Sequence, residues 1–255
     1  MKQQSRYNGR VGLYPTNRIE QFKVNWSPSW GPTPIHWYST DDKDFQTDFG
    51  SIKKDFVGYI APGSYTYSTT KNSLSVASPN SNTTFETSYT PDSIGYNTTS
   101  FVVIKPPAFS AAPDNVIQIA SYQPSATPLI TGASSITIGK TGYIYGTSIY
   151  TTNNGSSYTN LSVAATYSTS EWYVIVYKGK SSLSQTSSGT INGRAMSATA
   201  SFDVPLVTGK NGILVKLINN TTPYVAEVIV YDSILSGANT TLVENYLKSK
   251  WAITY

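Results

Sequence analysis

The sequence contains no cysteine and one histidine, His36. The absence of cysteine excludes disulfides and thiolate metal sites. A zinc site or a histidine-based catalytic triad would need partner residues, and the sequence offers no candidates around His36, which stands between Ile35 and Trp37. We therefore interpret His36 as a packing or hydrogen-bonding residue and expect no cofactor.

Charge is scarce as well. Asp, Glu, Lys and Arg make up 13% of the 255 residues, about half the usual share, and Ser, Thr, Asn and 20 tyrosines take their place. The formal net charge is only +4, and the basic residues are scattered along the chain. Because a basic run of the kind that binds nucleic acid is missing, we expect no nucleic-acid partner.

Long apolar runs are also missing. None approaches the roughly eighteen residues of a membrane-spanning helix, so no membrane span is expected. Residues 1–10 lack the apolar core of a signal peptide. The sequence therefore predicts a chain that is mature after processing or that leaves the cell by a route other than a classical signal peptide.

What the chain does contain is a series of short β-prone runs separated by turn residues. The clearest are residues 100–105, 171–178 and 224–231, which are continuously apolar over most of their length, as is typical of strands buried on both faces. About a dozen such runs, without βαβ alternation, predict an all-β jelly-roll sandwich of antiparallel strands. We expect it to form one domain over residues 31–255.

The apolar spacing changes after Leu235. The residues that recur on one helical face are Leu242, Val243, Tyr246, Leu247 and Trp251, whereas Lys248 and Lys250 fall mostly on the other. Ser236 is suited to cap the first turn, and the two lysines suit the negative end of the helix dipole. The sequence therefore predicts one C-terminal amphipathic helix that covers an end of the sandwich.

Three C-terminal segments resemble the signature of the concanavalin A-like (laminin G-like, pentraxin-like) β-sandwich superfamily. They are Glu227-Val-Ile-Val-Tyr231, Leu235-Ser236 and Val243-Glu244-x-Tyr246-Leu247-x-x-Lys250-Trp251. Residues 34–42 are similar to the superfamily's opening strand, and Trp172 with Asn192-Gly193 is similar to its Trp strand and Asn-Gly hairpin. Where members often carry an acid three residues after the serine, this chain has Asn239. The resemblance implies a concanavalin A-like jelly roll and says little about function.

Glycoside-cleaving relatives of this fold carry the motif Glu-x-Asp-x-x-Glu, because strand alternation then points both carboxylates into one cleft. The motif is absent here, since Glu171, Glu227 and Glu244 each lack a carboxylate two residues away. We therefore expect that the protein is not an enzyme.

The densest acidic cluster is Asp41-Asp-Lys-Asp44 with Asp48. Laminin G-like relatives can bind calcium through loop carboxylates, and oxygen ligands suit this ion. Lys43 stands in the middle, and the spacing is not that of an EF-hand. We interpret the cluster as a solvated loop, with calcium binding as the alternative.

Two sets of residues are suited to glycans. Aromatic side chains beside hydroxyls and amides are the groups that bind sugars, although they are equally normal on sandwich surfaces. The candidate contacts in the central region are Tyr122, Tyr143, Tyr145, Tyr150 and Tyr158. Glycosylation sequons, which chance would also supply in so Asn-, Ser- and Thr-rich a chain, stand at Asn25, Asn82, Asn97, Asn154, Asn160, Asn219, Asn220 and Asn239.

Residues 1–30 show little periodicity and carry Arg6, Arg10 and Arg18, so we interpret them as an extended arm that frays or tethers a neighbouring subunit. Two functions follow. The first is a non-enzymatic structural protein of an external assembly, such as a virion capsid, turret or spike component that associates with copies of itself; the composition is similar in style to virion proteins of archaeal viruses. The alternative is a lectin-like module that binds surface glycans. Both predict a virion or extracellular surface location.

Overall fold

The computed structural model describes side chains at residues 31–40, 70–76, 98–106, 168–179, 188–196 and 224–255. It describes the backbone alone at 57–58, 65–69, 77–79, 84–86, 114–123, 130–138, 144–152, 155–162, 197–198 and 210–216. In this part of the chain no helix is long and apolar enough to cross a membrane.

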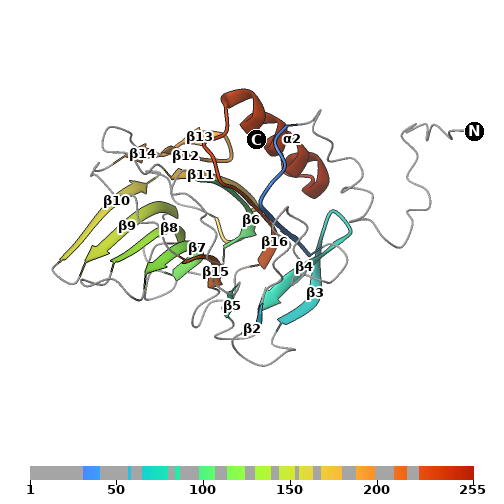
Figure 1. Ribbon diagram of the computed structural model, residues 1–255. Coiled ribbons are helices and arrows are strands. Elements are labelled where there is room, and N and C mark those ends of the chain that lie inside the picture. Colours follow the sequence, from blue (N-terminus) through green and yellow to red (C-terminus); the bar gives the residue numbers. More distant parts are fainter. Residues whose placement is uncertain are drawn as a thin grey trace, which may run out of the picture.

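The described residues form two antiparallel sheets and one C-terminal helix, α2 (Gly237–Trp251) (Figure 1). The first sheet has the strand order β13 (Arg194–Ala195), β12 (Ser188–Ile191), β11 (Tyr173–Gly179), β6 (Thr98–Lys105), β16 (Tyr224–Tyr231), β4 (Leu74–Pro79), β3 (Tyr65–Lys71), and β1 (His36–Ser39) also pairs with β16. The second has the order β14 (Ser197–Ala198), β10 (Gly155–Ser162), β9 (Ile144–Thr152), β8 (Ile130–Ile138), β7 (Asp114–Gln123), β15 (Lys210–Lys216), β5 (Thr84–Glu86), β2 (Val57–Gly58). The predicted antiparallel β architecture with a C-terminal helix is confirmed for these residues.

The three continuous apolar runs form the centre of the first sheet. Phe101 of β6 pairs with Val176 of β11 and with Ile229 of β16, and the next row pairs Val102 with Val228. Adjacent residues point to opposite faces, yet all five are at most 1% exposed. Both faces of the sheet are therefore covered, which is why these strands are continuously apolar instead of alternating.

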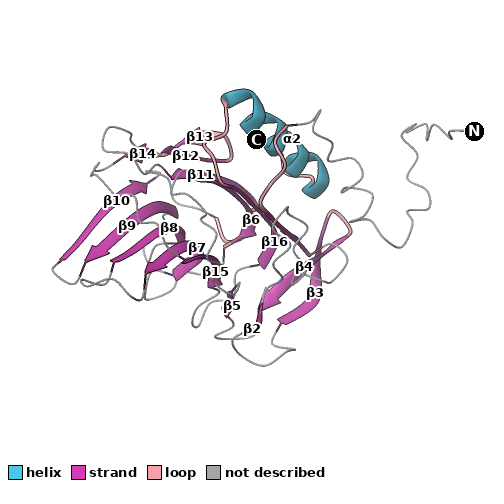
Figure 2. Ribbon diagram, in the orientation of Figure 1, coloured by secondary structure: helices cyan, strands magenta, loops and turns pink. Residues whose placement is uncertain are grey.

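Helix α2 lies against one face of the first sheet (Figure 2). The helix was expected to cover an end of the sandwich, but its buried residues Val243, Leu247 and Trp251 share a core cluster with mid-strand residues such as Phe101 and Ile229. Complete burial of one such side chain is worth about 1.5–3 kcal/mol, so this face contributes much of the stability of the C-terminal segment.

Two helix residues were assigned to the wrong face. Leu242 was predicted to be buried and is 48% exposed, because Val243, Leu247 and Trp251 repeat every four residues and turn position 242 away. Lys250 was placed on the polar face, but it is 6% exposed because it meets a buried carboxylate on β16.

The helix caps explain where α2 begins and ends. The Ser236 hydroxyl accepts a hydrogen bond from the Asn239 amide at 3.2 Å, which confirms the predicted N-cap. At the other end Ala252 adopts a left-handed conformation with φ of 47°, and the Ile253 amide donates to the Lys248 carbonyl at 3.0 Å. This arrangement is a Schellman motif, in which glycine is the usual residue.

Two hairpins have two-residue turns with positive φ, as type I′ turns require. One turn is Asn72-Ser73, whose Asn72 amide donates to the Lys250 carbonyl at 2.8 Å and so holds the end of α2. The other is Asn192-Gly193. The Asn192 side chain accepts from the Val174 amide at 2.8 Å and donates to the Trp172 carbonyl at 3.3 Å. The Trp strand and the Asn-Gly hairpin noted in the sequence therefore lie in contact.

Candidate functional site

The most elaborate polar site in the described residues centres on Glu227, in the middle of β16. The pairing of β16 with β6 has a bulge between Val225 and Glu227. A bulge re-aims the side chains beside it, and both Ala226 and Glu227 lie on the side of the sheet that faces α2. Glu227 is 0% exposed, so its charge must be compensated by groups within the protein.

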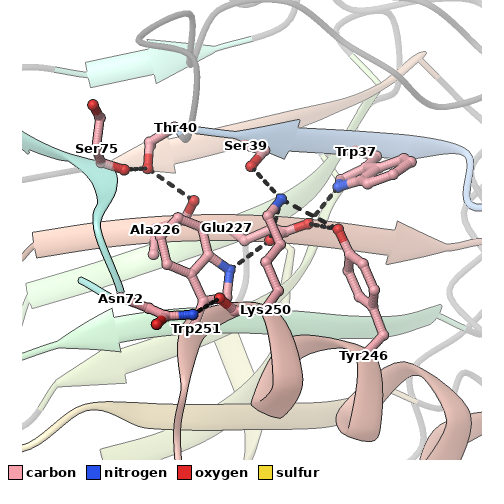
Figure 3. A network of polar contacts seen from close by, with 10 residues as sticks. All are labelled: Trp37, Ser39, Thr40, Asn72, Ser75, Ala226, Glu227, Tyr246, Lys250 and Trp251. Atoms are coloured by element: carbon pink, nitrogen blue, oxygen red, sulfur yellow. Dashed lines mark hydrogen bonds and ion pairs between the residues drawn. The ribbon is translucent and has the colours of Figure 1, made fainter. Parts of the chain in front are cut away.

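Both carboxylate oxygens of Glu227 have two partners (Figure 3). Oε1 accepts from the Trp37 indole at 2.6 Å and from the Tyr246 hydroxyl at 2.9 Å. Oε2 accepts from the Trp251 indole at 2.6 Å and forms an ion pair with Lys250 Nζ at 3.0 Å. The donors come from β1 and α2, so one carboxylate joins three elements that are far apart in sequence.

The Lys250 ammonium is equally well satisfied. Its side chain is 1% exposed, and Nζ also donates to the Ser39 hydroxyl at 2.9 Å and to the Tyr246 hydroxyl at 3.2 Å. These contacts engage all the donors that an ammonium group has. We refer to Trp37, Ser39, Glu227, Tyr246, Lys250 and Trp251 as the Glu227 cluster.

Thr40 follows Ser39 of the Glu227 cluster and lies along the same edge of β16. β1 and β4 lie end to end along one edge of β16, since β1 pairs with residues 227–230 and β4 pairs at Val225. The Thr40 hydroxyl lies at the junction, and its one proton is within hydrogen-bond reach of two carbonyls, those of Ser75 at 2.8 Å and Ala226 at 3.0 Å (Figure 3). This threonine therefore supplies hydrogen bonds at the point where the edge of β16 changes partner.

The Glu227 cluster is suited to holding the fold together and not to chemistry. A general acid or base must reach a substrate, and this carboxylate is sealed from solvent with both oxygens occupied. The other carboxylates with described partners are apart from it: Glu171 accepts from the Tyr173 hydroxyl at 3.0 Å, and Glu244 accepts from the Thr190 hydroxyl at 3.3 Å.

Metal chemistry has no site among the described residues, where no three potential ligands lie together. The acidic residues 41–48, the candidate calcium loop, lie outside the described part of the chain. His36 is 2% exposed, and its Nδ1 lies 3.2 Å from the Tyr38 hydroxyl, in agreement with a packing and hydrogen-bonding role.

Burial raises the pKa of three described tyrosines, Tyr173, Tyr231 and Tyr255. It raises the pKa of Tyr231 above the ordinary value of 10.0, and the Glu227 carboxylate raises it further. Burial also raises the pKa of Tyr255, with a smaller contribution from Glu244. The Tyr231 hydroxyl is buried and has no hydrogen-bond partner among the described residues, so it is a polar group inside the core of the first sheet.

Four of the five candidate glycan-contact tyrosines lie in the second sheet, where the backbone alone is described. Tyr122 is in β7, Tyr145 and Tyr150 are in β9, and Tyr158 is in β10. Tyr143 lies outside the described residues. The fold thus brings a sequence region of about forty residues into neighbouring strands of one sheet, which the sequence alone did not indicate.

The remaining candidates are placed as follows. Asn160 is in β10, and Asn239 is partly buried in the first turn of α2 beside Gly31. The other sequon asparagines and the arm residues lie outside the described residues: Asn25, Asn82, Asn97, Asn154, Asn219, Asn220, Arg6, Arg10 and Arg18.

Comparisons with known proteins bear on the fold. No protein-family model matches the chain, and no curated protein sequence matches it. Solved structures do match. A botulinum neurotoxin serotype D binding domain has a TM-score of 0.60 at 13% identity and covers 84% of this chain and 51% of its own. Botulinum neurotoxin type C, which depends on interaction with two ganglioside molecules to enter cells, has a TM-score of 0.52 at 10% identity and covers 84% and 51%.

A third structure, Trypanosoma rangeli sialidase, has a TM-score of 0.58 at 9% identity and covers 94% of this chain and 39% of its own. This chain therefore spans about half the length of the toxin domains that it matches, and less of the sialidase. At these identities the likeness shows a shared β-rich fold.

Proposed function

We propose that this chain is a lectin-like, non-enzymatic module that binds surface glycans in an extracellular setting, and that its two sheets form a concanavalin A-like jelly roll. The observation that carries the proposal is the shared fold over 84% of the chain with toxin binding domains, one of which interacts with gangliosides. Gangliosides present oligosaccharides at a membrane surface, so this likeness favours glycan binding over the other functions considered.

The described charged residues support binding in preference to catalysis. Glu227 and Lys250 are used inside the fold, and Glu171 and Glu244 hydrogen-bond to neighbouring side chains. Most retaining and inverting glycosidases use two carboxylates that face each other across a cleft, although sialidases use a tyrosine as the nucleophile. No such pair is formed by these three glutamates.

The prediction of a virion component gains no support from these comparisons, so we place glycan binding first. Self-association and a tether formed by the arm belong to the virion hypothesis and stay predictions. Calcium binding by the acidic loop likewise stays an alternative to a solvated loop.

The test is a glycan array probed with the full chain, with and without calcium. The array should include ganglioside oligosaccharides, other sialylated glycans and their neutral counterparts. We expect saturable binding to at least one class, and the thermally unfolded chain is the control for nonspecific adhesion. Absence of binding to every glycan, by a chain shown to be folded, would contradict the proposal.

A further inference from the structure

Strand register divides the tyrosines of the second sheet between its two faces. Tyr158 pairs with Ile149, Ile149 with Ala133, and Ala133 with Ala120. Residues that pair across antiparallel strands share a face, and residues two apart along a strand share it too. Position 122, two residues after Ala120, is therefore on the same face as position 158.

The two tyrosines of β9 are on opposite faces. Tyr145 is four residues before Ile149 and shares its face, whereas Tyr150 is the next residue and takes the other. The pairing agrees. Tyr150 is matched with Gly132 and Ser157, which are the sequence neighbours of Ala133 and Tyr158 and therefore lie on the opposite face. Positions 122, 145 and 158 thus share one face, which we call the tyrosine face, and position 150 does not.

The two faces differ in composition. Many positions on the tyrosine face carry hydroxyls and amides, at Gln118, Thr131, Ser135, Thr147, Thr151 and Asn160, and Ile149 and Leu214 are its large aliphatic residues. The opposite face carries more large aliphatic residues, at Ile119, Ile136, Ile138, Ile144, Leu161 and Ile213, together with small and polar residues such as Gly132, Ser148 and Ser157. An antiparallel sheet with one apolar and one polar face packs its apolar face on the core, so the pattern assigns the tyrosine face to solvent.

Charge on the tyrosine face is uneven. Lys210 of β15 pairs directly with Tyr122, so a cation stands beside an aromatic position at one end. Farther along, the same face carries Glu86, which is matched with Leu214, and Lys216, two residues beyond Leu214 in β15. A cation next to an aromatic residue is suited to a sugar that carries a carboxylate, since charge-assisted hydrogen bonds add to ring stacking.

We infer that the tyrosine face is the glycan-binding surface and that it takes an acidic oligosaccharide. The carboxylate-bearing sugar is bound at Lys210 and Tyr122, and the neutral sugars extend across β8 and β9 toward Tyr158. Strand spacing puts positions 122 and 158 about 15 Å apart, which suits an oligosaccharide and not a single sugar. This inference rests on the proposed function and specifies its site and ligand class.

The test uses the full chain with 3′-sialyllactose and lactose as probes, with affinities measured by calorimetry or saturation-transfer NMR. We expect Tyr122→Ala and Tyr158→Ala each to weaken sialyllactose binding about tenfold. Lys210→Gln should weaken sialyllactose and leave lactose unchanged. Ser157→Ala is the matched control, because it neighbours Tyr158 on the opposite face, and it should stay within about twofold of the native affinity.

The outcomes separate the two proposals. If the native chain binds glycans but the Tyr122 and Tyr158 variants keep native affinity, the site inference is wrong and the proposed function stands. Equal affinity for lactose and sialyllactose overturns the acidic ligand class. If the chain binds no glycan, both fail.

A second measurement does not depend on whether the variants fold. Tyrosine nitration of the native chain with and without sialyllactose should show protection at Tyr122 and Tyr158 and none at Tyr150. Protection confined to Tyr150 would overturn the assignment of faces.

Discussion

The two sheets use their side chains differently. In the central strands of the first sheet both faces are buried, one of them under α2, and even charged and indole groups make internal contacts, as in the Glu227 cluster. In the second sheet, register places most of the large aliphatic residues on one face and Tyr122, Tyr145 and Tyr158, with many hydroxyls and amides, on the other. The comparison indicates that the first sheet supplies stability and the second supplies a surface. Four predictions test this division, in order of decreasing effect.

The largest effect is expected at the Glu227 cluster. Glu227→Ala leaves Lys250 and two indoles without their acceptor in a dry site, so the free energy of unfolding should fall by about 3–5 kcal/mol. Urea unfolding followed by tryptophan fluorescence measures this loss. Glu244→Ala is the control, because this partly exposed glutamate on α2 has one 3.3 Å hydrogen bond and should cost less than about 1 kcal/mol.

A second variant separates charge from packing. The double variant Glu227→Leu with Lys250→Met removes both charges and should recover part of the loss, because the two indoles still lack an acceptor. If Glu227→Ala alone costs under about 1 kcal/mol, the cluster is not what joins α2 to the sheet.

The second prediction concerns Tyr231, whose buried hydroxyl lacks a partner in the described part of the chain, while its ring packs edge-on against the Phe101 ring, with centroids 6.0 Å apart. Tyr231→Phe keeps the ring and removes the unsatisfied group, so stability should rise by about 1 kcal/mol. The folded state holds the phenol proton more tightly than the unfolded state, because burial raises the pKa of Tyr231. Native stability should therefore fall above pH 10, where the unfolded tyrosine ionises, and the variant should lose less there. Thermal melts at pH 7 and 10.5 compare the two, and a destabilised variant would contradict the prediction.

The third prediction is a smaller gain at the end of α2. Ala252 has a left-handed φ of 47°, which costs a residue with a Cβ atom energy that glycine does not lose. Ala252→Gly should raise stability by about 0.5–1 kcal/mol, measured by thermal unfolding. Ala238→Gly, at an exposed position within the same helix, is the control and should lower stability by a similar amount.

The smallest effect is expected on the tyrosine face. Thr147 lies mid-strand in β9, yet Thr147→Ala should change the free energy of unfolding by no more than about 0.5 kcal/mol, since position 147 belongs to the tyrosine face. Phe101→Ala, mid-strand in the first sheet, should cost about 3–5 kcal/mol by the same assay. Equal losses at the two positions would remove the distinction between the sheets.

Much of the first sheet and α2 was predictable because its signals are local. The continuous runs of β6, β11 and β16 reflect two-sided burial, and Ser236 marks the start of the helix. The extra short strands β2, β5, β13 and β14, of two or three residues, left no periodic signal. They exist because a longer neighbour offers unpaired backbone groups.

The candidate site was less predictable. A glutamate inside the apolar run of β16 indicated something unusual, but its indole partner Trp37 is 190 residues away and Lys250 looked like a surface residue. The five tyrosines were recognised as a group, but not which of them share a face. Between Asn115 and Ile117 the register of β7 shifts, so residue counting alone would misplace faces.

The sequence by itself determined the kinds of element in the described chain, namely antiparallel strands and a closing helix, because periodicity and capping act within a few residues. The tertiary structure decided which elements meet: the burial of Lys250 against Glu227, the exposure of Leu242 and the common face of positions 122, 145 and 158. The physical reason is that pairing and packing depend on segments far apart in the chain, where a one-residue shift in register moves every following side chain to the opposite face.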